Sequence, residues 1–151
     1  MGKVSASVVV PGRISGAEAL WYDVGRWPAF VDGFASVVGR DEPWPATGGT
    51  LIWDSTPHGR GRIIERVTAY APRDGQSVAF EDEKVEGTQQ VAFAAEGENT
   101  RVTLSMEYRL KERNPITPVI DLFFVRRAVG DALRRTLGRF ARERQGDLEL
   151  S

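Results

Sequence analysis

The C-terminal part of the chain constrains the fold most, because residues 118 to about 145 have the pattern of one long amphipathic helix. Thr117 and Pro118 form a start signal: threonine accepts a bond from a first-turn N–H, and proline gives up a donor that lacks a partner there anyway. About 28 residues at ~1.5 Å each make a rod of roughly 40 Å, so other elements must wrap along it. The stripe that recurs at three- and four-residue steps is Leu122, Val125, Val129, Leu133, Thr136, Leu137 and Phe140.

The first half of this helix differs from the second, because residues 119–125 are apolar almost all round. Such a segment is predicted to be buried on all sides. Gly130 and Gly138 each cost about 1 kcal/mol relative to alanine, which predicts a close backbone approach or a bend. The apolar run ends at Arg126, well short of the roughly 18 residues of a membrane span. A docked core helix is therefore favoured, with a surface-lying amphipathic anchor as the alternative.

Length and charge limit the function classes. The 151 residues, 41% of them hydrophobic, predict a single domain over 1–151, with 146–151 as a frayed tail. A formal charge of -1 gives no overall attraction to nucleic acid or anionic lipid, so neither a nucleic-acid partner nor stable membrane insertion is expected. The N-terminus lacks the apolar segment and cleavage site of a signal peptide, which predicts a cytoplasmic protein.

The residue inventory limits the chemistry further. The chain has no cysteine, which excludes disulfides, thiolate catalysis and cysteine metal sites. His58 is the one histidine, so multi-histidine metal sites are excluded too. The glycines form no nucleotide fingerprint, because Gly59 and Gly61 precede a strand pattern whereas a phosphate cradle opens a helix. We therefore expect no metal and no cofactor; the oligomeric state is left open.

The N-terminal third predicts one strand and two short helices. Residues 4–10 alternate with the period of a strand, and Pro11-Gly12 ends it. Ser15 and Glu18 have the spacing of a capping box at the start of a short helix. Gly25 stops that helix, and residues 26–31 form a second short helical piece.

The middle of the chain has the pattern of six consecutive strands. Short turn-forming segments separate them, which predicts an antiparallel meander. In the last strand Val102, Leu104 and Met106 alternate with charged and hydroxyl residues, so one face is covered and one is wet. The result is an α+β helix-grip plan, a curved seven-stranded antiparallel sheet around the long helix. The expected strands are 34–40, 50–55, 62–71, 77–83, 88–96 and 101–111.

This arrangement resembles the START/Bet v 1-like (SRPBCC) helix-grip superfamily, in particular the bacterial polyketide cyclase/dehydrase and lipid-transport group. The resemblance covers roughly residues 4–144, and it implies a hydrophobic cavity between sheet and helix for a lipid, polyketide or other apolar molecule. The matching segments are Leu20-Trp21-Tyr22-Asp23, Arg26-Trp27-Pro28-Ala29-Phe30, Gly48-Gly49-Thr50, Gly61-Arg62, Glu65-Arg66-Val67-Thr68 and Asn99-Thr100-Arg101-Val102-Thr103-Leu104.

The chain departs from the aromatase/cyclases of that group. Those enzymes place a tryptophan and an arginine on the strand that resembles 62–71, where this chain has Ile64 and Tyr70, and Phe34 falls near one of their tyrosines. The departure argues against cyclase activity and leaves the implied cavity unaffected.

Candidate site residues follow from the aromatic and polar pattern. Arg66 and Tyr70 share a strand face with Ile64, and a guanidinium and a phenol can hold an enolate or carboxylate; which face lines the cavity is left open. His58 has the one side chain whose ordinary pKa lies near neutrality, so Arg66, Tyr70 and His58 are the catalytic candidates. The expected ligand-binding set is Trp27, Phe30, Trp53, Ile64, Arg66, Tyr70, Phe80, Phe93, Met106, Tyr108, Phe123 and Phe124.

Three functions remain open at this point. The favoured one is a binding module for an apolar small molecule: a lipid, a polyketide or an aromatic metabolite. The second is a polyketide cyclase/dehydrase acting on a poly-β-keto chain, and the third is a membrane-associated lipid or quinone chaperone. The missing aromatase residues and scarce acid–base groups disfavour the second, and the net charge disfavours the third.

Overall fold

A computed structural model describes residues 2–111 and 118–150, with side chains described for all of these except 118–122. The element order confirms the predicted α+β helix-grip plan, with two short helices after the first strand and one long helix at the end. The elements are β1 (Gly2–Pro11), α1 (Ile14–Trp21), the 3-10 turn η1 (Val24–Arg26), α2 (Trp27–Phe30), β2 (Phe34–Arg40), β3 (Thr50–Ser55), β4 (Arg62–Ala71), β5 (Gly75–Glu81), β6 (Val85–Glu96), β7 (Asn99–Leu110) and α3 (Pro118–Leu150).

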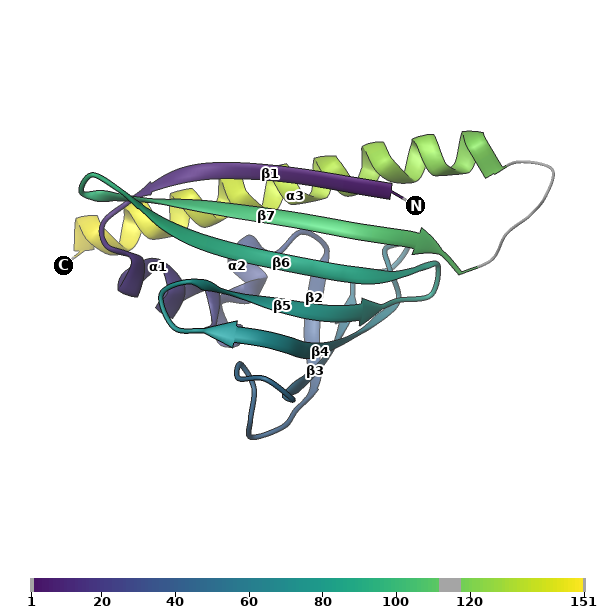
Figure 1. The fold of residues 1–151 in the computed structure, drawn as a ribbon, viewed down its shortest axis with the longest axis horizontal. Coiled ribbons are helices and arrows are strands. Elements are labelled where there is room, and N and C mark those ends of the chain that lie inside the picture. The colour runs from purple at the N-terminus through teal and green to yellow at the C-terminus, as the bar shows by residue number, and fades with distance from the viewer. Residues whose placement is uncertain (1, 112–117, 151) are drawn as a thin grey trace.

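The seven strands form one antiparallel sheet in the order β1-β7-β6-β5-β4-β3-β2. Hairpins join β2 through β7 in sequence, whereas β1 pairs with β7 across the whole chain, from Gly2 opposite Tyr108 to Pro11 opposite Asn99. Helix α3 runs along β1 and β7, and α1 and α2 lie near its C-terminal end (Figure 1). The sheet therefore has one face turned toward helices and one turned toward solvent.

Alternation along the strands decides which side chains enter the interior. In β7, Val102, Leu104 and Met106 are buried while Arg101 and Glu107 are exposed, which confirms the predicted faces. The same alternation settles the orientation of β4, which the sequence leaves open. Its buried side chains are Ile63, Glu65 and Val67, and its exposed ones are Arg62, Ile64 and Arg66.

A β-bulge in β4 separates two residues that simple alternation places together. The pairing with β5 shifts between Val67 and Ala69, so that Tyr70 stands opposite the buried Gln76. Tyr70 then packs edge-on against Tyr22, with ring centroids 5.6 Å apart. The prediction that Arg66 and Tyr70 share one face is therefore wrong, because the extra residue reverses the alternation.

The C-terminal half of α3 packs as its stripe predicts. Leu133, Leu137 and Phe140 are buried, and the Phe140 ring meets Trp21 and Phe30 with centroids 5.5 and 5.2 Å away. Such edge-on aromatic pairs add to the free energy gained by burial alone. This cluster fixes α3 against the two short helices.

The N-terminal half of α3 is not buried on all sides, contrary to the prediction. Phe123 and Phe124 are 64% and 63% exposed. The 33 residues of α3 span about 50 Å, whereas the 10 residues of β1 beneath it span only about 33 Å. The helix therefore extends past the strand that supports it (Figure 1).

Other local predictions for the helices also need correction. Gly130 has no atom closer than 3.5 Å to the site of a Cβ and Gly138 has none within 4 Å, so neither marks a close approach. The helix continues to Leu150, because Arg26 pairs with Glu143 and Asp147, each at 2.7 Å, and holds that end. Residues 146–150 are thus helical where the sequence predicts a frayed tail, and residue 151 lies outside the described residues.

The predicted capping box at α1 does not form. The helix begins at Ile14 with Arg13 as the capping residue, which makes no side-chain cap bond. Glu18 instead accepts a hydrogen bond from the backbone N–H of Arg73 at 2.7 Å, which ties α1 to the β4–β5 turn. The Glu18 carboxylate thus makes a tertiary hydrogen bond and not the helix cap that the local spacing predicts.

Candidate ligand-binding cavity

A cavity of about 470 Å³ lies between the inner face of the sheet and α3. This volume falls within the roughly 300–1,000 Å³ of small-molecule sites in proteins. Most of its wall is apolar. The lining residues are Trp21, Trp27, Val31, Asp32, Gly33, Trp53, Ser55, His58, Gly59, Arg60, Glu65, Asp82, Lys84, Val85, Gln89, Leu104, Met106, Val125, Ala128, Val129, Ala132, Leu133, Arg135 and Thr136.

Small side chains on α3 keep the cavity open. Ala128 and Ala132 lie four residues apart on the wall of the helix that faces the sheet, and each ends at Cβ. The neighbouring Val129 and Leu133 also line the cavity and pack with the hydrophobic core. The space left beside the alanines is therefore walled by apolar carbon.

Glu65 is a buried carboxyl on this apolar wall. Its side chain lies between Leu51 of β3 and Phe80 of β5, its direct cross-strand neighbours, and the residue is only 6% exposed. One carboxyl oxygen, Oε2, accepts a hydrogen bond from the indole Nε1–H of Trp53 at 2.7 Å. Burial raises the pKa of Glu65 above its ordinary value of 4.5, against the lowering effects of the Trp53 bond and the Arg60 charge.

Next to Glu65, an arginine and an aspartate form a polar end of the cavity. Arg60 Nε donates to Asp82 Oδ2 at 2.8 Å, and the Asp82 side chain is 3% exposed. Asp82 Oδ1 also accepts from the backbone N–H groups of Lys84 and Val85 at 2.8 and 2.9 Å. The Arg60 guanidinium lies 5.7 Å from the Trp53 ring centroid and 5.4 Å from that of Phe80. Asp82 thus forms an ion pair with Arg60 through Nε of the guanidinium.

Asp32 fastens the α2–β2 connection to α3 at another edge of the cavity. Its carboxylate accepts from Arg135 Nε at 2.9 Å and from Arg139 at 3.1 Å, and its backbone N–H donates to Thr136 Oγ1 at 3.0 Å. The hydrogen bond from Arg135 is the main cause of a lowered pKa for Asp32. These three hydrogen bonds attach the α2–β2 connection to α3 at this edge of the cavity.

The sequence-predicted residues divide into several groups in space. Trp27, Trp53, Met106 and His58 line the cavity, with His58 exposed in the β3–β4 connection. Ile64 and Arg66 lie on the opposite face of the sheet, and Phe123 and Phe124 are exposed on α3. The remaining candidates belong to the apolar core without lining the cavity: Phe30, Tyr70, Phe80, Phe93 and Tyr108.

Sequence reasoning missed most polar groups of the cavity, among them Glu65, Arg60, Asp82 and Gln89. A weak signal for Glu65 exists in strand 62–71, because its two face neighbours, Ile63 and Val67, are β-branched and apolar. No comparable signal marks Arg60 and Asp82, which come from two different connections between strands.

The raised pKa of Glu65 predicts how stability depends on pH. The folded state holds the Glu65 proton more tightly than the unfolded chain does. The contribution of Glu65 to the free energy of unfolding is therefore fully present below about pH 4.5 and is lost as the pH rises through the raised pKa. Glu65→Gln cannot ionise. We expect the difference in unfolding free energy, wild type minus Glu65→Gln, to fall as pH rises above 4.5, as measured by urea denaturation across pH. A difference that is flat in pH, or that rises, would contradict this assignment.

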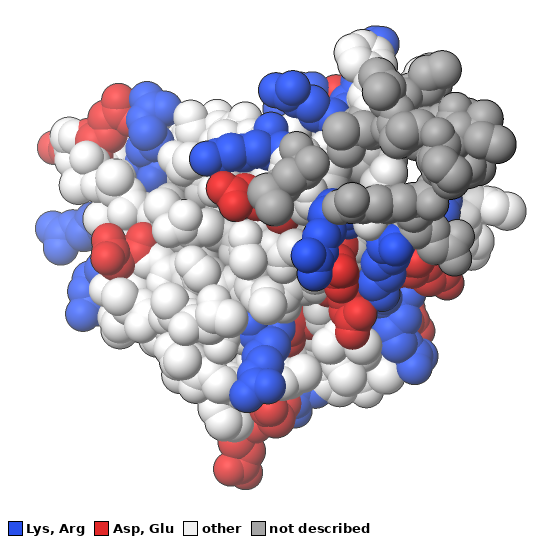
Figure 2. Space-filling view, turned by 45° about the vertical axis from the view of Figure 1, so that its right-hand side comes forward, with Lys and Arg blue, Asp and Glu red and all other residues white. Residues whose placement is uncertain are grey.

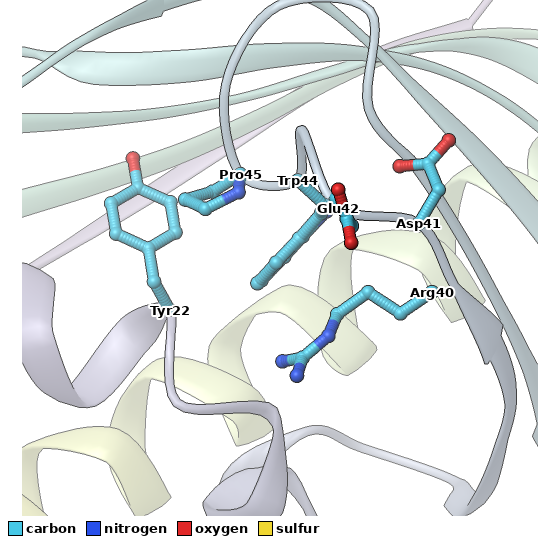
Figure 3. Close-up of a pocket in the computed structure, with 6 residues that line it drawn as sticks. All are labelled: Tyr22, Arg40, Asp41, Glu42, Trp44 and Pro45. Carbon is cyan, nitrogen blue, oxygen red and sulfur yellow. The ribbon is translucent and has the colours of Figure 1, made fainter.

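A second hollow of about 310 Å³ opens on the surface near the β2–β3 connection (Figure 3). Trp44 lies between Tyr22 and Arg40, with the Tyr22 ring edge-on at 6.1 Å and the Arg40 guanidinium 6.0 Å from its ring centroid. Among the described residues the Tyr22 hydroxyl and the Trp44 indole N–H have no hydrogen-bond partner. Burial is the main cause of the raised pKa of Tyr22. Trp44 is thus a buried loop tryptophan that packs against Tyr22, the residue after α1, and against Trp27 of α2.

Figure 2 shows acidic and basic side chains interspersed over one face of the molecule, with a broad uncharged area between them. Within residues 2–111 and 118–150, no helix is long and apolar enough to span a membrane.

Comparison with known proteins decides the family. Residues 1–144 match the family described as polyketide cyclase/dehydrase and lipid transport. The chain belongs to this family. The match confirms the resemblance that the sequence motifs indicate, and family membership goes with binding of hydrophobic ligands. Comparison with curated proteins gave no significant match.

Solved structures of low sequence identity share the fold of this chain. A protein from Thermus thermophilus has a TM-score of 0.74 at 18% identity, covering 96% of this chain and 98% of its own. A START superfamily protein from Mycobacterium smegmatis has a TM-score of 0.69 at 14% identity, covering 97% and 99%. A polyketide-cyclase-like protein from Corynebacterium glutamicum has a TM-score of 0.67 at 16% identity, covering 97% and 93%. At these identities the likeness concerns the fold.

Proposed function

We propose that this protein binds an apolar small molecule, such as a lipid, polyketide or aromatic metabolite, in the cavity between the sheet and α3. The observation that carries the proposal is a space of about 470 Å³ whose wall is mostly apolar and holds a few polar groups, among them Glu65, Arg60 and Asp82. Small-molecule sites typically combine these two properties. Burial of apolar ligand surface supplies the binding free energy, and the polar end fixes the orientation.

The positions of the acid–base candidates favour binding over cyclisation. The catalytic candidate Arg66 is exposed on the outer face of the sheet, and Tyr70 packs against Tyr22 and does not line the cavity. His58 lies on the wall but is exposed in a connection between strands. A proton-transfer residue must come within hydrogen-bond reach of the reacting atom, and these three do not converge on one point.

Filling the cavity is predicted to block binding. Ala132→Phe places a ring in the space beside α3, so a neutral apolar fluorophore should lose on the order of tenfold or more in affinity. The measurement is a fluorescence titration under native conditions, where the wild type should take up one probe per chain. Displacement of the probe by apolar competitors should also weaken in the variant.

Ala19→Phe is the matched control, because Ala19 is exposed on α1 and lies outside the cavity wall. It should bind the fluorophore as the wild type does. Equal affinities for wild type and Ala132→Phe, with both proteins folded by circular dichroism, would overturn the proposed site. Probe uptake that needs partly denaturing conditions would do the same, because the probe would then report an exposed core.

A further inference from the structure

Glu65 is an acid where the fold needs only a hydrogen-bond acceptor. Trp53 donates its indole N–H to Oε2, a bond that a neutral amide oxygen accepts equally well. The other carboxyl oxygen has no hydrogen bond within the described part of the chain, yet Glu65 lines the cavity. One polar atom of a buried side chain therefore remains to be satisfied from inside the cavity.

The charge of Arg60 lowers the pKa of Glu65, but within the described residues no charged group on the cavity wall forms an ion pair with this carboxyl. Arg60 is held by Asp82 at 2.8 Å, and Arg135 is held by Asp32 at 2.9 Å. Lys84 and His58 also line the cavity, but both are exposed to solvent. A carboxyl buried between Leu51 and Phe80 without a cation of its own avoids the cost of a buried charge by keeping its proton.

We propose that Glu65 carries a proton and donates a hydrogen bond to a neutral carbonyl oxygen of the bound ligand, so that the cavity selects apolar ketones or esters over hydrocarbons. This inference rests on the proposed function and names its ligand class. A protonated carboxyl has one O–H donor, and Trp53 occupies the other oxygen. The O–H is left for the ligand.

The same geometry disfavours a ligand that presents a carboxylate at this end. Asp82 and Glu65 are both acids on the wall, and the guanidinium of Arg60 between Trp53, Phe80 and Asp82 is already paired. An anionic head group here would find Arg60 already paired with Asp82 and Arg135 already paired with Asp32, while the third cation on the wall, Lys84, is exposed to solvent. A fatty-acid anion, if it enters, should therefore leave its head group at the mouth.

The test uses two probes of nearly equal shape, fluorene and 9-fluorenone, which differ by one carbonyl group. Affinities are measured by isothermal titration calorimetry at pH 5. We expect 9-fluorenone to bind wild-type protein about three- to tenfold more tightly than fluorene, the effect of one hydrogen bond to a buried donor. The infrared C=O band of bound 9-fluorenone should also move to lower wavenumber relative to the ketone in hydrocarbon solvent.

Two substitutions at Glu65 separate the donor from the bulk of the side chain. Glu65→Leu keeps the volume and removes the donor, so the preference for 9-fluorenone and the infrared shift should both disappear. Glu65→Gln keeps an acceptor for Trp53 and supplies an N–H₂ donor to the cavity, so it should retain the preference. Glu65→Gln also serves alone if Glu65→Leu fails to fold.

The pH dependence distinguishes the two donors. In wild type, raising the pH through the raised pKa of Glu65 removes the donor and leaves a carboxylate facing the carbonyl oxygen, so the 9-fluorenone preference should be lost. In Glu65→Gln it should not depend on pH. The other titratable groups on the wall, Asp32, His58, Asp82 and Lys84, are present in both proteins and act as an internal control.

The outcomes separate the two levels of the proposal. If both probes bind one per chain with equal affinity, or if Glu65→Leu keeps both the preference and the infrared shift, the role of Glu65 is overturned and the binding function stands. If neither probe binds wild type under native conditions, the proposed function itself fails. A preference that persists unchanged at pH values where Glu65→Gln and wild type should differ would also overturn the donor assignment.

Discussion

Phe140→Ala is expected to lower the free energy of unfolding by about 3–5 kcal/mol, as for other buried phenylalanines that leave a cavity. Phe140 is fully buried, and its ring contacts Trp21 and Phe30 at centroid distances of 5.5 and 5.2 Å. Removing the ring therefore loosens α3 from both short helices at once. Urea denaturation of wild type and variant gives the difference directly.

Phe124→Ala is the matched control, because it makes the same substitution in the same helix at a residue that is 63% exposed. Its effect should stay within about 0.5 kcal/mol. Equal losses in the two variants would show that the stripe of α3 does not decide its docking. A loss below about 1 kcal/mol in Phe140→Ala would contradict the burial of its ring against α1 and α2.

Asp82→Ala is expected to cost about 2–3 kcal/mol, because it leaves the partly buried Arg60 guanidinium without its partner and frees two backbone N–H groups. The value stays below that of a fully buried ion pair, since the Arg60 side chain is 34% exposed and water can reach it. The same substitution should reduce binding of neutral apolar probes, because an unpaired guanidinium then faces the cavity. Chemical denaturation and the fluorescence titration measure the two effects.

Asp54→Ala provides the comparison for that result. Asp54 also pairs with an arginine, Arg62, at 2.9 Å, but on the solvent side of the sheet. An exposed pair is screened by water and ions, so only a small change in stability is expected and none in probe binding. Similar losses for the two aspartates would mean that burial does not set the strength of the Arg60–Asp82 pair.

Local patterns predicted the elements of this fold accurately where burial repeats along a segment. The strand over 101–111 and the helical stripe ending at Phe140 each repeat one kind of residue at the period of their structure. The predicted ends of the strands are less accurate. Strand β6 begins at Val85 and not at residue 88, because Val85 pairs with Leu110 of β7 and extends the ladder. Pairing partners far along the chain are invisible to a local pattern.

Other predictions from the sequence are wrong where a tertiary contact decides the local structure. The apolar start of α3 is exposed around Phe123 because the helix outruns β1, a comparison of lengths between elements far apart in the sequence. Tyr70 moved to the inner face because of a bulge that depends on pairing with β5. The Glu18 carboxylate does not form the predicted cap, because it accepts a hydrogen bond from the backbone N–H of Arg73.

The candidate site shows the same limit. Sequence alone determined the fold plan, the family and the presence of a largely apolar interior, because these depend on periodicity and on motifs within single segments. Only the tertiary structure decided that Glu65 faces inward beside Trp53 and that Asp82 meets Arg60, since these side chains come from four segments. A buried polar group acquires its chemistry from the neighbours that bury it, and those neighbours are chosen by the register of the sheet.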